Sequence, residues 1–442
     1  MQITAKTLNR RNRVKSEGNE DVKLLNCKLY TVMYKPFEIK ENLFYVGVND
    51  RTKHLFENLW PLPKGVSYNS YIINDEKIAL IDTVDICYAD VFFNKIRSVL
   101  GDKQIDYLIV NHMEPDHSGS VELLKTRYPQ IKIVGNSRTA EMLKGYYGIT
   151  DNVVVIEDKE ELNLGKNNLQ FYLTPMVHWP ETMMTYVKES KTLFSADAFG
   201  TFGTLDGGVT DIQLNPERYW DEMIRYYSNI VGKFGSPVQA ALKKLSGMGI
   251  ETICSTHGPV WTQPDTLGKV VSLYDRLSRY ESENGLVIAY GSMYGNTEQL
   301  AEIIAAAAAE NGARNIIMHN VSKSHESEVL RDIFKYRGLI IGSPTYNNKL
   351  YPAVESLLSA LQNRNVKNKF FSFFSGHTWA DGAKRELKAF AEGMEFETIC
   401  ESVEMKQSLN RNVMENAYAL GKAMAERLHS GDAVIPHKTT CH

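Results

Sequence analysis

The first part of the chain alternates short apolar runs with polar turns. The runs are Ser67–Ile73, Ile78–Asp82, Ile105–Val110, Ile131–Val134, Val153–Ile156 and Leu169–Leu173. Runs of this length predict strands, and the polar turn Asn74–Lys77 predicts a hairpin between the first two. Because each run ends in a polar loop, the region from about Pro36 to Tyr280 is predicted to be an α/β domain with a mixed sheet and functional loops at strand ends.

The later part of the chain alternates strands and helices more regularly. Strands are predicted at Leu286–Tyr290, Asn315–Met318, Gly338–Gly342 and Phe370–Phe374. Helices are predicted from about Thr297, near Val329, at Ala353–Leu361, after Gly382 and at Val413–Leu428. Such β-α alternation over about 150 residues predicts a doubly wound parallel sheet.

A charged, breaker-rich joint, Glu281–Asn284, separates the two patterns. The predicted organisation is therefore an N-terminal extension at 1–35, a first domain at 36–280, a second domain at 284–430 and a C-terminal tail at 431–442. The fold class is α/β in both domains.

Composition and charge exclude some classes of function. The 442 residues are 43% hydrophobic and 23% charged, with a formal net charge of −3, so the basic excess that nucleic-acid or anionic-membrane binding needs is missing. The five cysteines are scattered and form no C-x-x-C pair, and no apolar run approaches the length of a membrane span. We expect a cytoplasmic protein. The basic stretch Met1–Lys15 leaves a transit peptide for an organelle such as a hydrogenosome as an alternative.

Four potential metal ligands lie within six residues after the strand that ends at Val110. They are His112, Glu114, Asp116 and His117, and the later residues His178, Asp197 and His257 also follow apolar runs. Imidazoles mixed with hard oxygens and no thiolate suit zinc, non-haem iron or manganese. Three carboxylates and one bridging hydroxide would neutralise two divalent ions. A neutral site can reach a higher-valent state without leaving a large buried charge, which favours a redox-active pair of metals. Trp179, Phe199 and Phe202 are candidates for a dry pocket wall, or for ordinary core packing.

The motif H-x-E-x-D-H, followed by His, Asp and His at strand ends, resembles that of the flavodiiron proteins, also called A-type flavoproteins. The resemblance spans roughly Pro36 to Leu428 and implies a metallo-β-lactamase-like αββα first domain with a diiron centre. It implies that His112, Glu114 and His178 hold one iron, that Asp116, His117 and His257 hold the other, and that Asp197 bridges them. The hydrolytic relatives carry His where this chain has Glu114, and an oxygen donor favours iron over zinc.

The second domain begins with a strand that leads through a hydroxyl-rich loop into a helix. The loop contains Ser292, Met293, Tyr294, Gly295, Asn296 and Thr297. Hydroxyls and free backbone N–H groups at a helix N-terminus would hold a phosphate, although the loop lacks the Lys of a P-loop and the pattern of dinucleotide folds. It resembles the phosphate site of flavodoxins.

Two later loops would then hold the isoalloxazine of FMN, because ligands of open parallel sheets bind at the carboxyl ends of the strands. These loops contain Pro344, Thr345, Tyr346, Asn347, Ser375, Gly376, His377, Thr378 and Trp379. Tyr346 and Trp379 are candidates to cover the ring. The third loop departs from the family's small-residue pattern at His377 and Thr378.

The family resemblance implies reduction of dioxygen to water, of nitric oxide to nitrous oxide, or of both, with electrons from FMN. It also implies a head-to-tail homodimer or a dimer of dimers, in which the FMN of one subunit lies beside the irons of the other. With no rubredoxin-type cysteine pairs after the last helix, a separate donor is expected, either a rubredoxin-like protein or a reduced deazaflavin. A dinuclear-metal hydrolase with an accessory flavodoxin domain and a non-catalytic electron carrier remain as alternatives.

Overall fold

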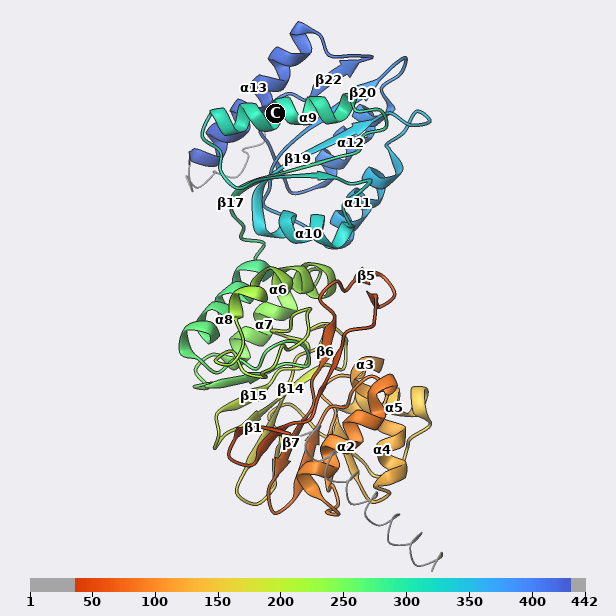
Figure 1. The fold of residues 1–442 in the computed structure, drawn as a ribbon, viewed down its shortest axis with the longest axis vertical. Coiled ribbons are helices and arrows are strands. Elements are labelled where there is room, and N and C mark those ends of the chain that lie inside the picture. The colour runs from red at the N-terminus through yellow and green to blue at the C-terminus, as the bar shows by residue number, and fades with distance from the viewer. Residues whose placement is uncertain (1–35, 431–442) are drawn as a thin grey trace, which may run out of the picture.

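The computed structural model describes residues 36–430, so the predicted extension at 1–35 and the tail at 431–442 lie outside the described residues. The described chain forms two stacked parts (Figure 1), the lower with two large sheets and the upper with one. The predicted domain limits stay predictions. Of the expected joint Glu281–Asn284, Glu283 and Asn284 already lie in a strand.

The lower part holds two large sheets packed face to face. The first has the order β1 (Phe37–Lys40), β2 (Leu43–Tyr45), β7 (Tyr71–Asn74), β8 (Ile78–Ile81), β9 (Tyr107–Ile109), β10 (Lys132–Gly135) and β11 (Val153–Val155). The second has the order β12 (Glu161–Asn163), β13 (Asn168–Leu173), β14 (Met183–Val187), β15 (Thr192–Phe194) and β16 (Thr252–Cys254). Both sheets mix parallel and antiparallel pairs, as predicted.

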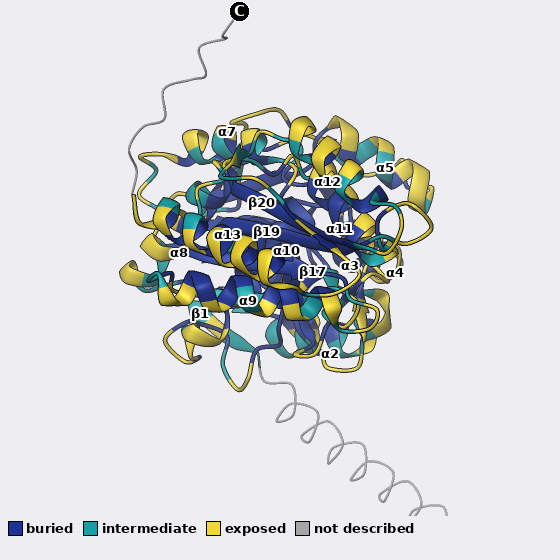
Figure 2. Cartoon of the chain, turned by 90° about the horizontal axis from the view of Figure 1, so that it is seen from above, coloured by how far each residue is buried: buried dark blue, intermediate teal, exposed yellow. Residues whose placement is uncertain are grey.

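Helices cover the outer faces of both sheets, so the layers follow an αββα order (Figure 1). On the side of the first sheet lie η1 (Ile86–Tyr88), α2 (Ala89–Leu100), α3 (Pro115–Ser118), α4 (Val121–Arg127) and α5 (Ser137–Tyr147). On the other side lie η2 (Pro216–Arg218), α6 (Trp220–Tyr226), η3 (Tyr227–Val231), α7 (Gly235–Leu245) and α8 (Pro264–Ser278). Seen from above, the strands of the upper part are mostly buried, and the exposed positions lie on the helices and loops around them (Figure 2).

One predicted strand, Ser67–Ile73, is wrong as a single element. It is divided into β6 (Val66–Tyr68), which pairs with β3 (Val48–Asp50), and β7 of the first sheet. The cause is Asn69, whose side-chain Nδ2 donates to the carbonyls of Ser255 and Gly258 and whose backbone N–H donates to the Thr256 carbonyl. These bonds replace the ladder bonds that a continuous strand would need. A further small pair joins β4 (Leu55–Phe56) and β5 (Trp60–Pro61).

The upper part contains one parallel sheet. Its order is β18 (Ile316–Asn320), β17 (Glu283–Tyr290), β19 (Tyr336–Pro344), β20 (Phe370–His377) and β21 (Glu397–Thr398), and β22 (Val403–Lys406) also pairs with β20. Its helices are α9 (Asn296–Glu310), α10 (Glu326–Lys335), α11 (Pro352–Asn363), α12 (Gly382–Gly393) and α13 (Arg411–His429). The predicted doubly wound arrangement is confirmed, while β21 and β22 were not predicted.

The two parts meet where α10 lies against α6 and η3 (Figure 1). The buried Arg225 donates to the carbonyl of Pro61 at 2.9 Å and to Ser327 Oγ at 3.3 Å. Asn229 Nδ2 donates to the Ser327 carbonyl at 3.1 Å. Buried apolar residues of both parts belong to one continuous core, so the contact is more than a flexible tether.

Candidate metal centre and flavin cavity

All seven predicted metal ligands lie just beyond strand ends of the two packed sheets. His112, Glu114, Asp116 and His117 follow β9, the last two within the short helix α3. His178, Asp197 and His257 follow β13, β15 and β16. All seven are buried, none more than 8% exposed. The sheet packing therefore brings together residues that are up to 145 positions apart in the chain, from His112 to His257.

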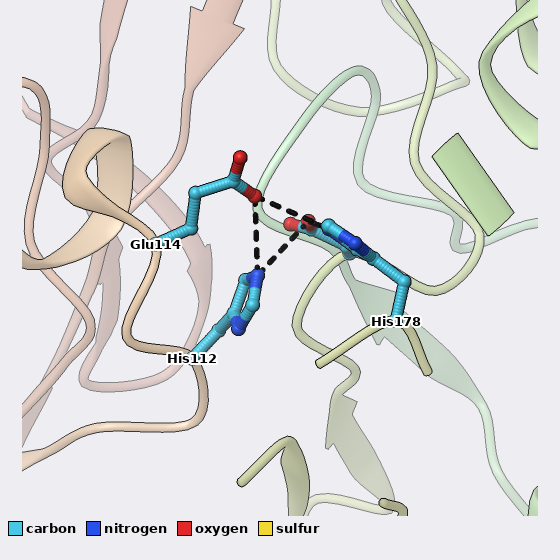
Figure 3. A group of neighbouring side chains, drawn as sticks. His112, Glu114 and His178 are labelled. Atoms are coloured by element: carbon cyan, nitrogen blue, oxygen red, sulfur yellow. Dashed lines mark hydrogen bonds and ion pairs between the residues drawn. The ribbon is translucent and has the colours of Figure 1, made fainter. Parts of the chain in front are cut away.

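The first group comprises His112, Glu114, His178 and Asp197. Glu114 Oε2 lies 3.2 Å from Nε2 of both His112 and His178, and the carboxylate points between the two rings (Figure 3). His178 Nε2 also lies 3.0 Å from Asp197 Oδ2. The donor atoms thus converge on one point from separate loops, which is what a coordination site requires.

The second group comprises Asp116, His117 and His257. The Nε2 atoms of the two histidines face each other at 3.1 Å, and each lies 3.4 Å from an oxygen of Asp116. Asp197 reaches this group too, because its Oδ1 lies 3.1 Å from His117 Nε2. One carboxylate therefore directs one oxygen to each group, as a bridging ligand would.

This centre has unsatisfied polar atoms that a metal ion would satisfy. Both oxygens of Asp116 are buried and form no hydrogen bond within the described residues. A buried carboxylate without a hydrogen bond is costly, and two imidazole nitrogens in contact can share at most one proton between them. Cations placed between these donors would satisfy both requirements, so the residues fit a pair of metal ions.

The electrostatics of the cluster favour added positive charge. Burial by itself lowers the pKa of His117 and His178, but the carboxylates of Asp116, Asp197 and Glu114 outweigh it and raise both pKa values to about 9. For Glu114 and Asp197 burial raises the pKa, yet the neighbouring histidines hold it well below the usual range of a carboxyl. Without metal the cluster would draw protons, and metal ions would replace them.

Groups behind the ligands orient the histidine rings, and the sequence did not reveal them. The fully buried Glu181 accepts from the N–H of Met113 at 2.9 Å and lies 2.8 Å from His112 Nδ1. His257 Nδ1 lies 2.7 Å from the Ser67 carbonyl. Since these oxygens only accept, each Nδ1 carries the proton and each Nε2 keeps its lone pair for a metal. Thr256 Oγ1 donates to Asp197 Oδ1.

Aromatic rings enclose the centre. Phe56, Tyr68 and Tyr226 lie with their ring centroids 5.3, 5.9 and 5.5 Å from that of His257. The Tyr226 hydroxyl is buried and has no hydrogen-bond partner within residues 36–430. Of the three predicted wall residues, Trp179 lies against His112 at 5.4 Å, and Phe202 packs behind Phe56 and Tyr226. Phe199 packs against Tyr274 and lines a different cavity.

The three predicted flavin loops surround one cavity of about 390 Å³ at the carboxyl ends of β17, β19 and β20. Its predicted lining residues are Met293, Tyr294, Asn296, Thr297, Pro344, Thr345, Tyr346, Asn347, Gly376, His377, Thr378 and Trp379. Asn348, Ala380, Met405 and Gln407 also line it and were not predicted. Ser292, Gly295 and Ser375 are not among the lining residues. Ser292 Oγ accepts from the Gly295 N–H, and Ser375 Oγ donates to Asp381.

The cavity offers groups that suit a flavin phosphate and its ring. Helix α9 begins after Gly295, which has a φ of +94° and so needs glycine, and no side chain of the described residues caps its first turn. The N–H groups of that turn are therefore available to an anion. At the rim, Tyr294 is 92%, Trp379 87% and Tyr346 43% exposed. Exposed aromatic rings of this kind suit an aromatic ligand that covers them.

Known proteins share both parts of this architecture. Residues 66–258 match the family described as ODP family beta lactamase, and residues 288–421 match the flavodoxin family. A nitric oxide reductase of Moorella thermoacetica is 30% identical over 401 residues, which cover 90% of this chain and 100% of that protein. The chain belongs to the flavodiiron proteins.

Solved structures agree with this membership. This chain superposes on the rubredoxin oxygen:oxidoreductase of Desulfovibrio gigas with a TM-score of 0.86 and 28% sequence identity. The superposition covers 90% of this chain and 99% of the Desulfovibrio gigas chain. This chain also superposes on the flavodiiron protein from Giardia intestinalis with a TM-score of 0.85 and 26% sequence identity. The superposition covers 90% of this chain and 97% of the Giardia intestinalis chain.

The flavodiiron protein is therefore an oxidoreductase with a metallo-β-lactamase-like part and a flavodoxin-like part, which confirms the predicted fold class. A flavodoxin-like part implies a flavin, and the buried histidine and carboxylate cluster implies metal. The ligand and flavin-contact assignments of individual residues stay predictions. None of the helices within residues 36–430 has the length and apolar character that crossing a membrane requires.

Proposed function

We propose that this protein reduces dioxygen to water, nitric oxide to nitrous oxide, or both, at two iron ions, with electrons that arrive through FMN. The observation that carries the proposal is the carboxylate of Asp197, which directs one oxygen to the His178 side and the other to the His117 side of the cluster. A bridging carboxylate between two sets of imidazole and oxygen donors suits two ions held close together.

The residues of each set would hold one ion. His112, Glu114 and His178 would bind the first and Asp116, His117 and His257 the second. Glu114 supports iron, since it adds an oxygen donor where a nitrogen donor would favour zinc. When bound, the two ions supply Lewis acidity and electrons to a small diatomic substrate.

Other residues hold the histidine ligands in one orientation and shield them from water. Glu181 and the Ser67 carbonyl fix the tautomers and ring orientations of His112 and His257. Phe56, Tyr68 and Tyr226 enclose His257 with apolar surface. The Tyr226 hydroxyl is the unpaired polar group in this wall, and it is suited to donate a hydrogen bond to an oxygen of the substrate.

FMN would occupy the cavity at the ends of β17, β19 and β20, with its phosphate at the start of α9. The exposed rings of Tyr294 and Trp379 at the rim support a head-to-tail homodimer, or a dimer of dimers, that covers this face. Electrons would come from a separate donor, either a rubredoxin-like protein, which the printed name of the Desulfovibrio gigas relative supports, or a reduced deazaflavin.

We place the protein in the cytoplasm. Within residues 36–430, Cys87, Cys254 and Cys400 are free thiols. Free thiols are typical of a reducing compartment.

The test is to add known amounts of oxygen, and separately of nitric oxide, to the anaerobically reduced protein loaded with iron and FMN. Gas electrodes follow the substrates while absorbance follows the flavin. We expect rapid loss of at least one gas with reoxidation of the flavin, and the two rates rank the substrates. If neither gas is consumed by protein that contains two irons and one FMN per chain, the proposal is wrong.

A further inference from the structure

His377 places an imidazole in the wall of the flavin cavity. It is the last residue of β20, and its side chain is only 7% exposed. Its backbone is held on the neighbouring strand end, since its carbonyl accepts from the Gln407 N–H at 2.7 Å. The backbone that carries the ring is therefore fixed at the wall of the cavity.

Two carboxylates flank this ring. Asp381 Oδ2 lies 3.4 Å from His377 Nδ1, and Glu404 Oε1 lies 3.6 Å from His377 Nε2. Asp381 is itself fixed, because it accepts from Ser375 Oγ at 2.7 Å and caps α12 by accepting from the Lys384 N–H at 2.9 Å. Glu404 lies on β22, beside the ring.

The charges around His377 come from two elements. From α12 and its cap come Asp381 and Lys384, and from β22 come Glu404 and Lys406, whose Cα pairs with that of His377. Lys384 Nζ lies 2.7 Å from Glu404 Oε2, so it already neutralises that carboxylate, and the cluster does not require a metal ion. The other ionisable groups of the cavity wall are the phenols of Tyr294 and Tyr346.

The imidazole ring of His377 does not use all of its hydrogen-bonding positions. His377 Nδ1 is buried and forms no hydrogen bond with any described residue. A histidine changes its charge near neutral pH more readily than other side chains, and each ring nitrogen of His377 faces a carboxylate oxygen that can accept from an imidazolium. A cofactor that gains negative charge in the adjacent cavity would favour the same change.

We propose that His377 takes up one proton when the flavin in this cavity is reduced. Two electrons from the external donor and one proton from the solvent convert oxidised flavin into its anionic reduced form. A second solvent proton, released by hydronium or by a water that leaves hydroxide in solution, forms an N–H bond on the imidazole, and the imidazolium offsets the new negative charge. The inference rests on the proposal that the cavity binds FMN.

The test measures the two-electron midpoint potential of the bound flavin against pH by spectroelectrochemistry, on the full chain loaded with FMN. Each proton taken up with two electrons changes the potential by about 30 mV per pH unit. The unmodified protein should therefore show about twice that slope over the pH range in which His377 gains its proton together with the reduction of the flavin. His377→Gln should show the single-proton slope throughout. His319→Gln is the matched control, because His319 also pairs with a carboxylate, Asp332, but does not line the cavity.

An unchanged slope in FMN-loaded His377→Gln, or the same loss in His319→Gln, would overturn the inference and leave the proposed function intact. Failure of the unmodified protein to bind FMN would instead overturn the proposed function. If His377→Gln does not retain FMN, Glu404→Gln decides, since Glu404 is outside the cavity lining. Removing its charge should move the change of slope to lower pH, and a change of slope at the original pH would contradict the inference.

Discussion

The metal centre and the flavin cavity both lie at the carboxyl ends of strands, yet they are built in opposite ways. The seven predicted ligands are at most 8% exposed, and their rings and carboxylates touch one another. At the flavin cavity, Tyr294 and Trp379 are largely exposed and the loops border open space. Buried charges have to be compensated by neighbouring groups inside the protein. Exposed loops are solvated, so they are stable without a bound ligand or partner. The centre should therefore depend on single residues far more than the cavity does.

The largest loss is expected from Asp197→Asn. Removing one partner from a buried ionic cluster costs about 3–5 kcal/mol, which corresponds to more than about a hundredfold in affinity. We expect fewer than two irons per chain and at least a hundredfold lower gas consumption. Metal analysis and gas electrodes measure both. Asp206→Asn, which affects a carboxylate paired with Arg51 at the surface, is the matched control and should retain both irons.

A smaller loss is expected from Glu181→Gln, since Glu181 orients His112 without belonging to the cluster of ligands. Loss of such a partner typically lowers metal affinity by about 10–100-fold. Competition with a chelator measures the affinity. Glu189→Gln, at an exposed carboxylate that accepts from Asn168, should leave it unchanged. Equal affinities in the two variants would show that the contact does not position the ring.

The protons of the metal-free cluster should make its stability depend on pH. Because the pKa values of His117 and His178 rise from 6.5 to about 9 on folding, their protonation stabilises the fold fully below about pH 6.5. This contribution is lost as the pH rises through about 9. Urea unfolding of metal-free protein should therefore show decreasing stability from pH 6.5 to 9. The iron-loaded protein should not, because metal replaces the protons, and identical pH profiles would contradict this account.

Tyr226→Phe should lower gas consumption by about tenfold, the loss of about one hydrogen bond in the transition state. Iron and FMN contents should not change, since the hydroxyl forms no hydrogen bond with a described residue. Tyr227→Phe is the control. Its hydroxyl is also buried and unpaired, but its ring packs against Tyr274 and Phe334 instead of His257. Equal activity in both variants would remove Tyr226 from the reaction.

The smallest effect should come from the open cavity. Trp379→Ala removes one stacking surface, and we expect FMN to bind about fivefold more weakly, a loss of about 1 kcal/mol. Titration of FMN into the apoprotein measures this, and the stability of the protein should not change. Tyr146→Ala, at a 56% exposed ring on α5, is the control. A loss as large as that of Asp197→Asn would erase the contrast between the two sites.

The sequence was most informative where the signal was local. H-x-E-x-D-H lies within six residues, and strand ends are visible as changes from apolar to polar positions. It was less informative for residues that lie far along the chain from the groups they contact. Glu181 stands 69 positions from His112, Tyr226 is the last residue of a helix that follows no strand end with a ligand motif, and Met405 and Gln407 reach the cavity from the unpredicted β22 region. Their sequence neighbours do not indicate which distant residues they meet.

The amino-acid sequence by itself determined the class of both parts, the loops that carry the chemistry and the types of donor atom available there, because periodicity and ligand chemistry are properties of short segments. Only the tertiary structure decided which donors meet. The pairing of Asp197 with both histidine groups, the tautomers set by Glu181 and the Ser67 carbonyl, and the carboxylates beside His377 depend on strand order and sheet packing. Those contacts form between residues far apart in the chain, where burial and hydrogen bonding over the whole fold select the neighbours.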